Sequence, residues 1–220
     1  MSEFQVVTPP AQEPLLLADA KAHLRVDGTA DDALILQKIR ACRFHLERQY
    51  DIALITQTLQ LNLDSFPYWW LWRGGSTNYY NWWLDQAYYT QLLLRPPVQS
   101  ITSVTYTDPS GNPQTMSAAD YVLDTNNRPA RLVPALNKQW PATAIGTINV
   151  AAVKFVAGYG AADTNVPDDI KEALMMLLGH FYENREQVVT DARVAAITMP
   201  LGVDQLMEPY AGIATGMFVA

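Results

Sequence analysis

The sequence predicts an α+β fold, in which a small antiparallel β-sheet has two long helices packed beside it, with an aromatic-rich excursion loop and a C-terminal arm. Two observations indicate this class. Apolar residues recur at helical spacing in one long segment near each end of the chain, and they alternate with a period of two in several short segments between. The chain has 220 residues, of which 49% are apolar and 17% charged, so it is long and apolar enough to form a folded core.

The first expected elements are helical. Residues 1–16 contain three prolines, and we expect an extended segment there. Residues 17–25 fit a short helix that ends at the Asp27-Gly28-Thr29 turn signal. A longer helix is expected over 31–50, because its apolar residues fall on one face: Ile35, Ile39, Cys42 and Leu46.

The middle of the chain has the pattern of β-strands. From Thr56 to Leu63 polar and apolar residues alternate, which is typical of a half-buried strand. The sequence Asp108-Pro109-Ser110-Gly111-Asn112 has the residue types of a tight turn, so the strands on either side should pair as a hairpin. The further expected strands are 91–95, 101–106, 114–116, 121–123, 131–133 and 148–156.

The C-terminal part begins with a strong helix and then loses its periodicity. Pro167 suits a first helical position, and a wide apolar face runs from Asp168 to about Glu186. Residues 187–202 show no period, and a last short helix is expected over 203–210. We therefore divide the chain into an extended segment 1–16, a connector domain 17–186 that carries the aromatic-rich insertion 68–89, and a C-terminal arm and tail 187–220.

The residue patterns of enzymes and of metal or cofactor sites are missing from the sequence. The three histidines, His23, His45 and His180, do not have the spacing of metal ligands. The sequence Gly158-Tyr159-Gly160 lacks the third glycine of a dinucleotide-binding loop, and no serine lies in a nucleophile elbow. We therefore expect no enzymatic activity, no catalytic residue, no metal and no cofactor.

Composition limits the possible environments and partners. No apolar run approaches the length of a membrane-spanning helix, the N-terminus lacks the features of a signal peptide, and Cys42 is the single cysteine, so we expect an intracellular protein with no membrane contact. The formal net charge of −7 argues against a protein that grips duplex DNA, because such affinity comes mainly from cations that meet phosphates.

Residues 68–89 form an unusual segment with ten aromatic side chains and only two charged ones, Arg73 and Asp85. The rings could pack on their own domain, stack on single-stranded nucleic acid or sugars, or lie at a membrane interface. A protein–protein contact is the favoured interpretation, because Tyr and Trp dominate interface hot spots. Besides Tyr68, the aromatic residues are the candidate interface residues Trp69, Trp70, Trp72, Tyr79, Tyr80, Trp82, Trp83, Tyr88 and Tyr89.

Several phrases of the sequence, taken in order, resemble one family. They are LLADAKAHLRV at 16–26, ALITQT at 53–58, RPPVQSI at 95–101, VAGYG at 156–160, VP at 166–167, GHFYENRE at 179–186 and LMEPY at 206–210. In this order they resemble the head–tail connector (adaptor) proteins of long-tailed bacteriophages and prophages, over most of residues 8–210. Two parts depart from the family: the excursion at 68–89 is longer, and the tail after Tyr210 is the chain's own.

The resemblance implies a structural virion protein without catalysis. Such proteins form a ring, commonly of twelve copies, beneath the portal in the virion neck. The ring extends the DNA channel and offers a docking surface to tail or tail-completion proteins. For this chain it implies self-association, contact with a portal protein, passage of genomic DNA without tight binding, and assembly in the cytoplasm of a bacterial host.

The family also suggests that C-terminal segments reach the portal. We expect residues 187–220 to become ordered on docking, since they combine lost periodicity with an apolar tail. The candidate residues of this portal-docking arm are Met199, Leu201, Leu206, Met207, Tyr210, Ile213, Met217 and Phe218. An alternative function remains open: a binding module whose aromatic loop contacts a glycan or a capsid or host surface.

Overall fold

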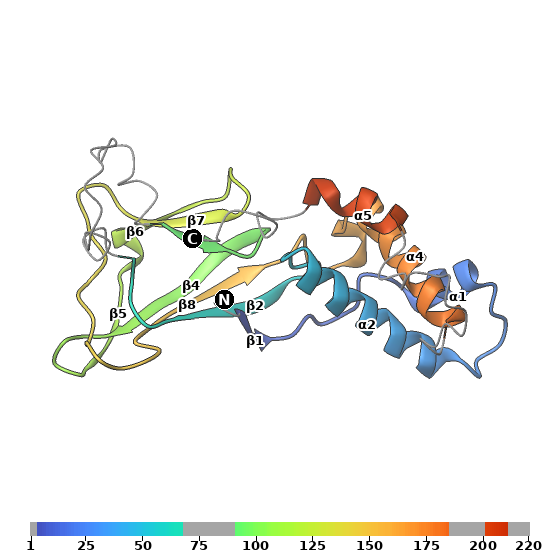
Figure 1. The fold of residues 1–220 in the computed structure, drawn as a ribbon, viewed down its shortest axis with the longest axis horizontal. Helices are drawn as coiled ribbons and strands as arrows, with labels where there is room; N and C mark the ends of the chain where they lie inside the picture. Colours follow the sequence, from blue (N-terminus) through green and yellow to red (C-terminus); the bar gives the residue numbers. More distant parts are fainter. Residues whose placement is uncertain (1–3, 68–90, 185–200, 211–220) are drawn as a thin grey trace, which may run out of the picture. The chain divides into compact units, whose positions relative to one another are not determined.

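The computed structural model of the protein describes residues 4–67, 91–184 and 201–210 (Figure 1). The chain divides into two compact units, each built from two separate stretches. A strand-rich unit contains Met1–Pro9 and Gln57–Ala157, and a helical unit contains Pro10–Thr56 and Gly158–Ala220. The predicted α+β class with antiparallel strands is confirmed, because every strand pair that the structure describes is antiparallel.

The strand-rich unit has two sheets where the sequence predicted one. The larger sheet has the strand order β1-β2-β8-β4-β5, and the smaller one has the order β3-β7-β6. The strands of the larger sheet are β1 (Phe4–Thr8), β2 (Gln57–Leu63), β8 (Ala151–Ala157), β4 (Val98–Thr107) and β5 (Pro113–Thr115). Those of the smaller sheet are β3 (Leu92–Leu94), β7 (Ala130–Pro134) and β6 (Tyr121–Asp124).

The alternating sequence of β2 fixes its register against β8. Leu59 pairs with Phe155, and Leu61 pairs with Val153. These four side chains are buried, while the residues between them are partly exposed, so the predicted half-buried strand is confirmed.

The sequence-predicted hairpin joins β4 to β5. The carboxylate Oδ1 of Asp108 accepts hydrogen bonds from the backbone N–H groups of Ser110 and Asn112, both at 2.9 Å. Gly111 lies at φ +86°, a conformation that an L side chain rarely adopts. These contacts close the turn that the residue types indicated.

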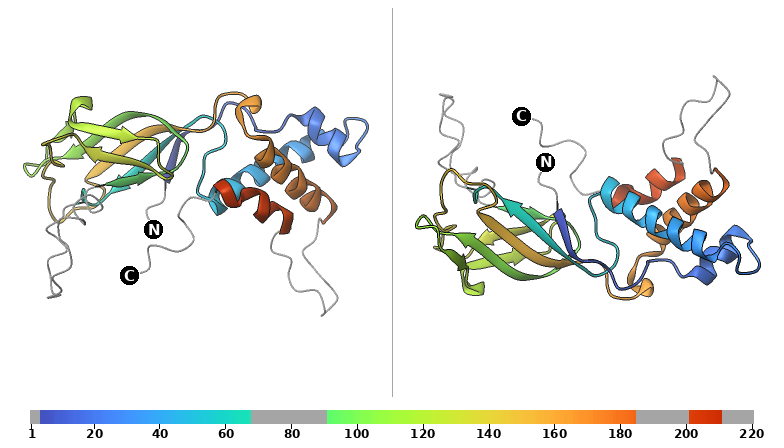
Figure 2. Two further views of the ribbon diagram at one scale, coloured as in Figure 1. Left: turned by 90° about the horizontal axis from the view of Figure 1, so that it is seen from above. Right: turned by 90° about the horizontal axis from the view of Figure 1, so that it is seen from below.

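Four helices of the described chain make up the helical unit, and Figure 2 shows them from two sides. They are α1 (Leu17–Leu24), α2 (Asp32–Gln49), α4 (Asp168–Glu183) and α5 (Leu201–Met207), which is followed by a 3-10 turn over Glu208–Tyr210. Helix α4 contacts α1, α2 and α5. None of the helices in the described residues is long and apolar enough to cross a membrane.

The core of the helical unit follows the predicted stripe of α2. Ile35, Ile39, Cys42 and Leu46 are fully buried, and they pack with the apolar face of α4 and with Val203 and Met207 of α5. The four helices bury their apolar faces against one another, as helices of this pattern must to be stable in water.

Candidate interaction surfaces

The described residues contain no group of three or more His, Cys, Asp or Glu side chains that could hold a metal ion. His45 lies on α2 with its ring edge-on to Phe181, at 6.2 Å between ring centroids. His180 lies on α4, where its Nδ1 is 3.3 Å from the side-chain nitrogen of Asn184. His23 lies on α1. The three rings are on three different helices, where His23 and His45 are exposed and His180 is half-buried.

The single cysteine is part of the core. Cys42 is fully buried in α2, and burial raises the pKa of its thiol to about 12. A thiol that stays protonated and shielded from solvent is a poor nucleophile. Cys42 therefore fills space between helices, as its position in the apolar stripe of the sequence indicated.

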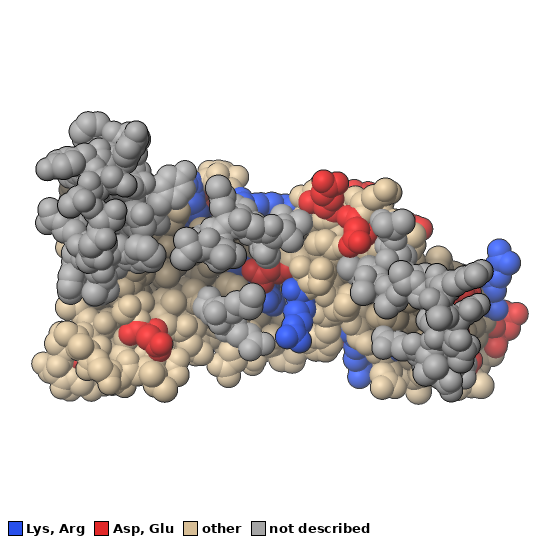
Figure 3. All heavy atoms as spheres, in the orientation of Figure 1, with Lys and Arg blue, Asp and Glu red and all other residues tan. Residues whose placement is uncertain are grey.

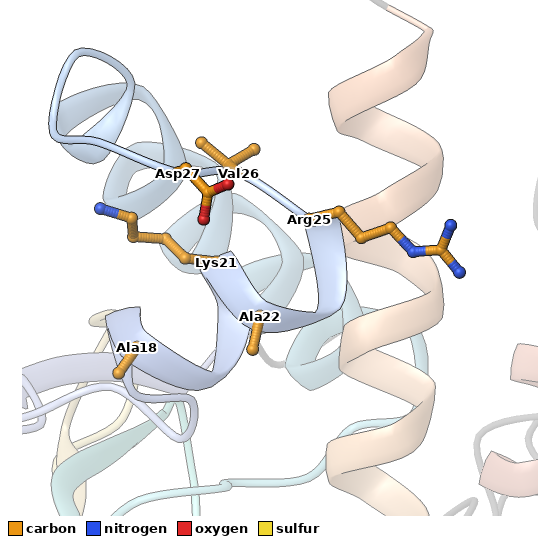
Figure 4. A pocket seen from close by; sticks show the side chains of 6 residues that line it. All are labelled: Ala18, Lys21, Ala22, Arg25, Val26 and Asp27. Atoms are coloured by element: carbon orange, nitrogen blue, oxygen red, sulfur yellow. The ribbon is translucent and has the colours of Figure 1, made fainter.

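A shallow hollow of about 490 Å³ lies beside α1, lined by Ala18, Lys21, Ala22, Arg25, Val26 and Asp27 (Figure 4). Its cationic side chains do not converge, because Lys21 and Arg25 point away from each other. The Nζ of Lys21 donates to the carbonyl oxygen of Gly28 and, at 2.7 Å, to Oδ1 of Asp32. These bonds hold the turn between α1 and α2, so the hollow lacks the convergent polar groups that a ligand site needs.

A buried ion-pair cluster joins three parts of the helical unit. Arg43 is 3% exposed; its Nε donates to Oε2 of Glu13 at 2.7 Å and its Nη1 to Oε2 of Glu47 at 2.9 Å. The other oxygen of Glu47 accepts the backbone N–H of Leu54 at 2.9 Å. Burial acts to lower the pKa of Arg43, but the carboxylates of Glu13 and Glu47 outweigh it and raise that pKa above its ordinary value. The cluster holds the segment before α1 and the segment after α2 against α2 itself.

Local sequence patterns do not reveal this cluster. Arg43 and Glu47 are spaced i, i+4 on α2, which is the signal for a helical ion pair, but such pairs are usually exposed. The partner Glu13 lies 30 residues away in the chain, so only the fold brings it to Arg43.

Three of the candidate portal-docking residues contact their own unit. Met207 is fully buried against the other helices, and Leu206 and Tyr210 pack against the same core. The hydroxyl of Tyr210 donates to Oδ2 of Asp169 at 3.2 Å. In this structure the side chain of Met207 is therefore not available at the surface. Leu201 is the first residue of α5, and Met199, Ile213, Met217 and Phe218 lie outside the described residues.

Helix α5 packs against α4, and a hydrogen bond connects it to Tyr50, the residue that follows α2. The hydroxyl of Tyr50 on the α2 side donates to Oδ1 of Asp204 at 2.6 Å, and burial together with this carboxylate raises the pKa of Tyr50. Gly202 allows the close approach, because a Cβ there would lie 2.5 Å from the terminal methyl of Met176. The described part of the C-terminal arm thus contains a packed helix of the helical unit.

All nine candidate interface aromatics lie outside the described residues. The described ends of this segment are set in the strand-rich unit, where it connects β2 of the larger sheet to β3 of the smaller one. Phe66 is fully buried and stacks on Trp140, with ring centroids 4.8 Å apart and planes at 4°. On the other side Leu92 is 7% exposed. Buried residues therefore flank the aromatic-rich segment on both sides.

Charge is divided unequally between the two units. By sequence the strand-rich unit has six basic and six acidic residues, whereas the helical unit has nine basic and 16 acidic residues. The whole net charge of −7 thus belongs to the helical unit. On the face drawn in Figure 3, wide parts of the described surface carry neither sign. A surface without charge is easier to bury against another protein than a charged one.

The fold is shared with solved structures, although no family model and no curated protein matches the sequence. A chain in the neck of an empty gene transfer agent (GTA) particle, computed with C6 symmetry, is 24% identical with a TM-score of 0.70, at 98% coverage of both chains. A chain in the virion of a native GTA particle is 24% identical with a TM-score of 0.69, at 97% of both. A chain in the neck of a native GTA particle, computed with C12 symmetry, gives 23%, 0.67 and 98% of both.

These matches cover both units, so the whole described architecture recurs in chains of GTA necks and of a GTA virion. Identities of 23–24% establish the common fold. The shared fold is consistent with the head–tail connector family that the sequence resembles.

Proposed function

We propose that this chain is a structural protein of the neck of a phage-like particle, where it forms the head–tail connector (adaptor) ring beneath the portal and acts without catalysis. One observation carries the proposal: the fold matches chains of GTA particle necks over 98% of both chains, with a TM-score of 0.70. Fold alone does not determine function, so the properties of the surfaces must agree with it.

The interior of the chain is consistent with a building block. The charged side chains of the Arg43 cluster and the thiol of Cys42 are engaged in packing, and the hollow beside α1 has no convergent polar groups. The features that remain for function are surfaces. These are the apolar and uncharged parts of the strand-rich unit, the aromatic-rich segment and the residues beyond α5.

The proposed ring consists of copies of this chain, commonly twelve in the family that the sequence resembles. Neighbouring copies meet through two different surfaces of the chain, and the rotation between them closes the ring. DNA passes through the ring without tight binding, because the acidic subunit gives few cations to neutralise phosphates. The portal lies on one side of the ring, and a tail or tail-completion protein docks on the other.

The aromatic residues at 69–89 are proposed to contact a neighbouring copy or a tail protein. Replacing Trp69, Trp70, Trp82 and Trp83 by Ala should leave a folded chain and impair assembly, because truncating one well-buried interface aromatic commonly costs about 2 kcal/mol or more of binding free energy. Unfolding of this variant would instead indicate that the rings belong to the chain's own core.

The C-terminal residues are proposed to reach the portal beyond the packed helix α5. Because Met207 is buried in the helical unit, docking through Met207 requires α5 to leave its place. Docking through Ile213, Met217 and Phe218, which follow the described residues, does not require α5 to move. Removing residues 211–220 should therefore keep the helical unit folded and weaken portal binding. Equal portal binding by the truncated chain would contradict this role.

The proposed function is tested by the mass of the purified protein, alone and then mixed with its portal protein, together with deletion of its gene. We expect a closed oligomer, or one that forms on the portal, and particles without the protein should fail to join heads to tails. Particles that mature and eject DNA normally in its absence would refute the proposal, and so would turnover of a substrate.

A further inference from the structure

The connection between β7 and β8, residues 135–150, presents three large aliphatic side chains to solvent. Leu136 is 88% exposed, Ile148 is 75% exposed and Ile145 is 98% exposed. Single exposed apolar residues are common on protein surfaces, but three large ones on a single loop expose much apolar area to water. We call residues 135–150 the aliphatic loop.

The aliphatic loop is held in place while these side chains stay exposed. Its Trp140 is 4% exposed and stacks on Phe66. The backbone N–H of Ala144 donates to the carbonyl oxygen of Thr107 at 3.0 Å, and that of Asn149 donates to Oδ1 of Asp64 at 2.8 Å. The chain therefore orders a loop with a buried centre and exposed aliphatic ends. Order in advance lowers the entropy lost when such a loop binds.

A second apolar site lies on another element of the same unit. Val6 and Val7 on β1 are each 42% exposed. Strand β1 is the outer strand of the larger sheet, and its residues FQVVT carry no charge and no proline. Edge strands usually carry charged residues or proline, which prevent pairing with another chain. Strand β1 has neither, so its edge is open to a contact.

The two sites are far enough apart to serve two neighbours. Val6 pairs with Leu59 of β2, whereas the aliphatic loop is bonded to Asp64, five residues further along the chain. At about 3.3 Å per residue of strand this corresponds to roughly 16 Å. A ring needs two different complementary surfaces on each copy, and the described strand-rich unit has them.

We propose that the aliphatic loop of one copy docks on the β1 edge of the next copy, and that this contact joins neighbours in the ring. The inference rests on the proposed function and names the surfaces of its self-association. Charge favours a second copy as the occupant: the strand-rich unit has equal numbers of basic and acidic residues, whereas contact between helical units would bring two excesses of acidic residues together.

The first test removes the apolar side chains. A variant with Leu136→Ser, Ile145→Ser and Ile148→Ser should keep the circular dichroism and thermal midpoint of the wild type, because these residues are 75–98% exposed. Its self-association, measured by sedimentation across protein concentrations, should weaken by about tenfold or more. A control with Leu16→Ser and Phe44→Ser removes exposed apolar residues from the helical unit and should associate like the wild type.

The second test joins the two sites covalently. In a variant with Val7→Cys and Ile145→Cys, a short bis-maleimide should give a ladder of cross-linked chains longer than dimers. Each single variant should give dimers at most. The native Cys42 does not interfere, because it is fully buried and its raised pKa keeps it a thiol.

The outcomes separate this inference from the proposed function. If the wild type oligomerises but the serine variant does so equally and no ladder forms, the inference is wrong and the ring proposal stands. If the serine variant oligomerises normally but no longer binds the portal, the loop contacts another particle protein, and the inference is again wrong. If the wild type never oligomerises, alone or on the portal, both proposals fail.

Discussion

Removing the charge of Arg43 tests whether the buried ion-pair cluster determines the stability of the helical unit. Replacing Arg43 by Met keeps much of the side-chain volume but removes the guanidinium between Glu13 and Glu47. The side chain of Glu47 is 6% exposed and that of Glu13 is 19% exposed, so Glu47 would retain a desolvated negative charge. Breaking a buried pair on one side typically costs about 3–5 kcal/mol of the free energy of unfolding.

A double replacement separates the cost of this charge from the value of the pair. Arg43→Met combined with Glu47→Gln removes both buried charges, and the amide oxygen of Gln still accepts the backbone N–H of Leu54. We expect the double variant to lose only about 1–2 kcal/mol relative to the wild type, because isosteric replacement of a whole buried pair is often nearly neutral.

Urea unfolding followed by helical circular dichroism measures both variants. Glu47→Gln alone is the matched control: Arg43 then keeps Glu13, and the loss should be smaller than in Arg43→Met. A cost below about 1 kcal/mol for Arg43→Met, or a double variant as unstable as the sum of the single ones, would refute the reasoning.

Three further predictions concern the backbone and pH. Gly158→Ala should lower the free energy of unfolding by about 2–4 kcal/mol, because φ is +131° and a Cβ there would lie 2.5 Å from backbone atoms. The control Gly146→Ala, at φ +81° in open space, should cost about 1 kcal/mol. Urea titration measures both. Cys42 should resist a thiol reagent in the folded protein. Because its pKa is raised from about 9.0 to about 12, its contribution to stability is complete below pH 9 and is lost as the pH rises. Cys42→Ala should reduce this alkaline loss of stability in a titration of the free energy of unfolding against pH. Hydrogen bonds from Arg131 lower the pKa of Asp124, so this carboxylate should stabilise the fold above its ordinary pKa of 3.8 and lose that effect as the pH falls; Arg131→Gln should reduce the dependence in acid unfolding followed by near-UV circular dichroism.

Local patterns predicted most of the secondary structure. The apolar stripe of α2 and the alternation of β2 are properties of residues that are near one another in sequence, and burial confirms both. The hairpin turn at Asp108 is local as well, since a carboxylate there bonds backbone groups two and four residues away. Such features need no knowledge of the rest of the fold.

Features that depend on long-range contacts cannot be predicted from local sequence patterns. Strand β1 was expected only as an extended segment, because its five residues show no alternation of polar and apolar side chains. It becomes a strand through its pairing with β2. Arg43 was not singled out in the sequence, because its ion pair with Glu13 forms only in the folded chain. The loop that carries Ile145 is held by the stacking of Trp140 on Phe66, two residues 74 positions apart.

The location of the excess charge bears on which contacts form a ring. Two unit charges 4 Å apart repel by about 1 kcal/mol in water, and salt screens them beyond roughly 8 Å. The seven excess negative charges of each helical unit therefore matter only where two such units come into direct contact. The strand-rich unit lacks this penalty and has the aliphatic loop, so burial of its exposed side chains is opposed by little electrostatic work. By this reasoning the proposed ring would join its copies through the strand-rich unit, and the acidic helical unit would be left to partners that tolerate or complement its charge.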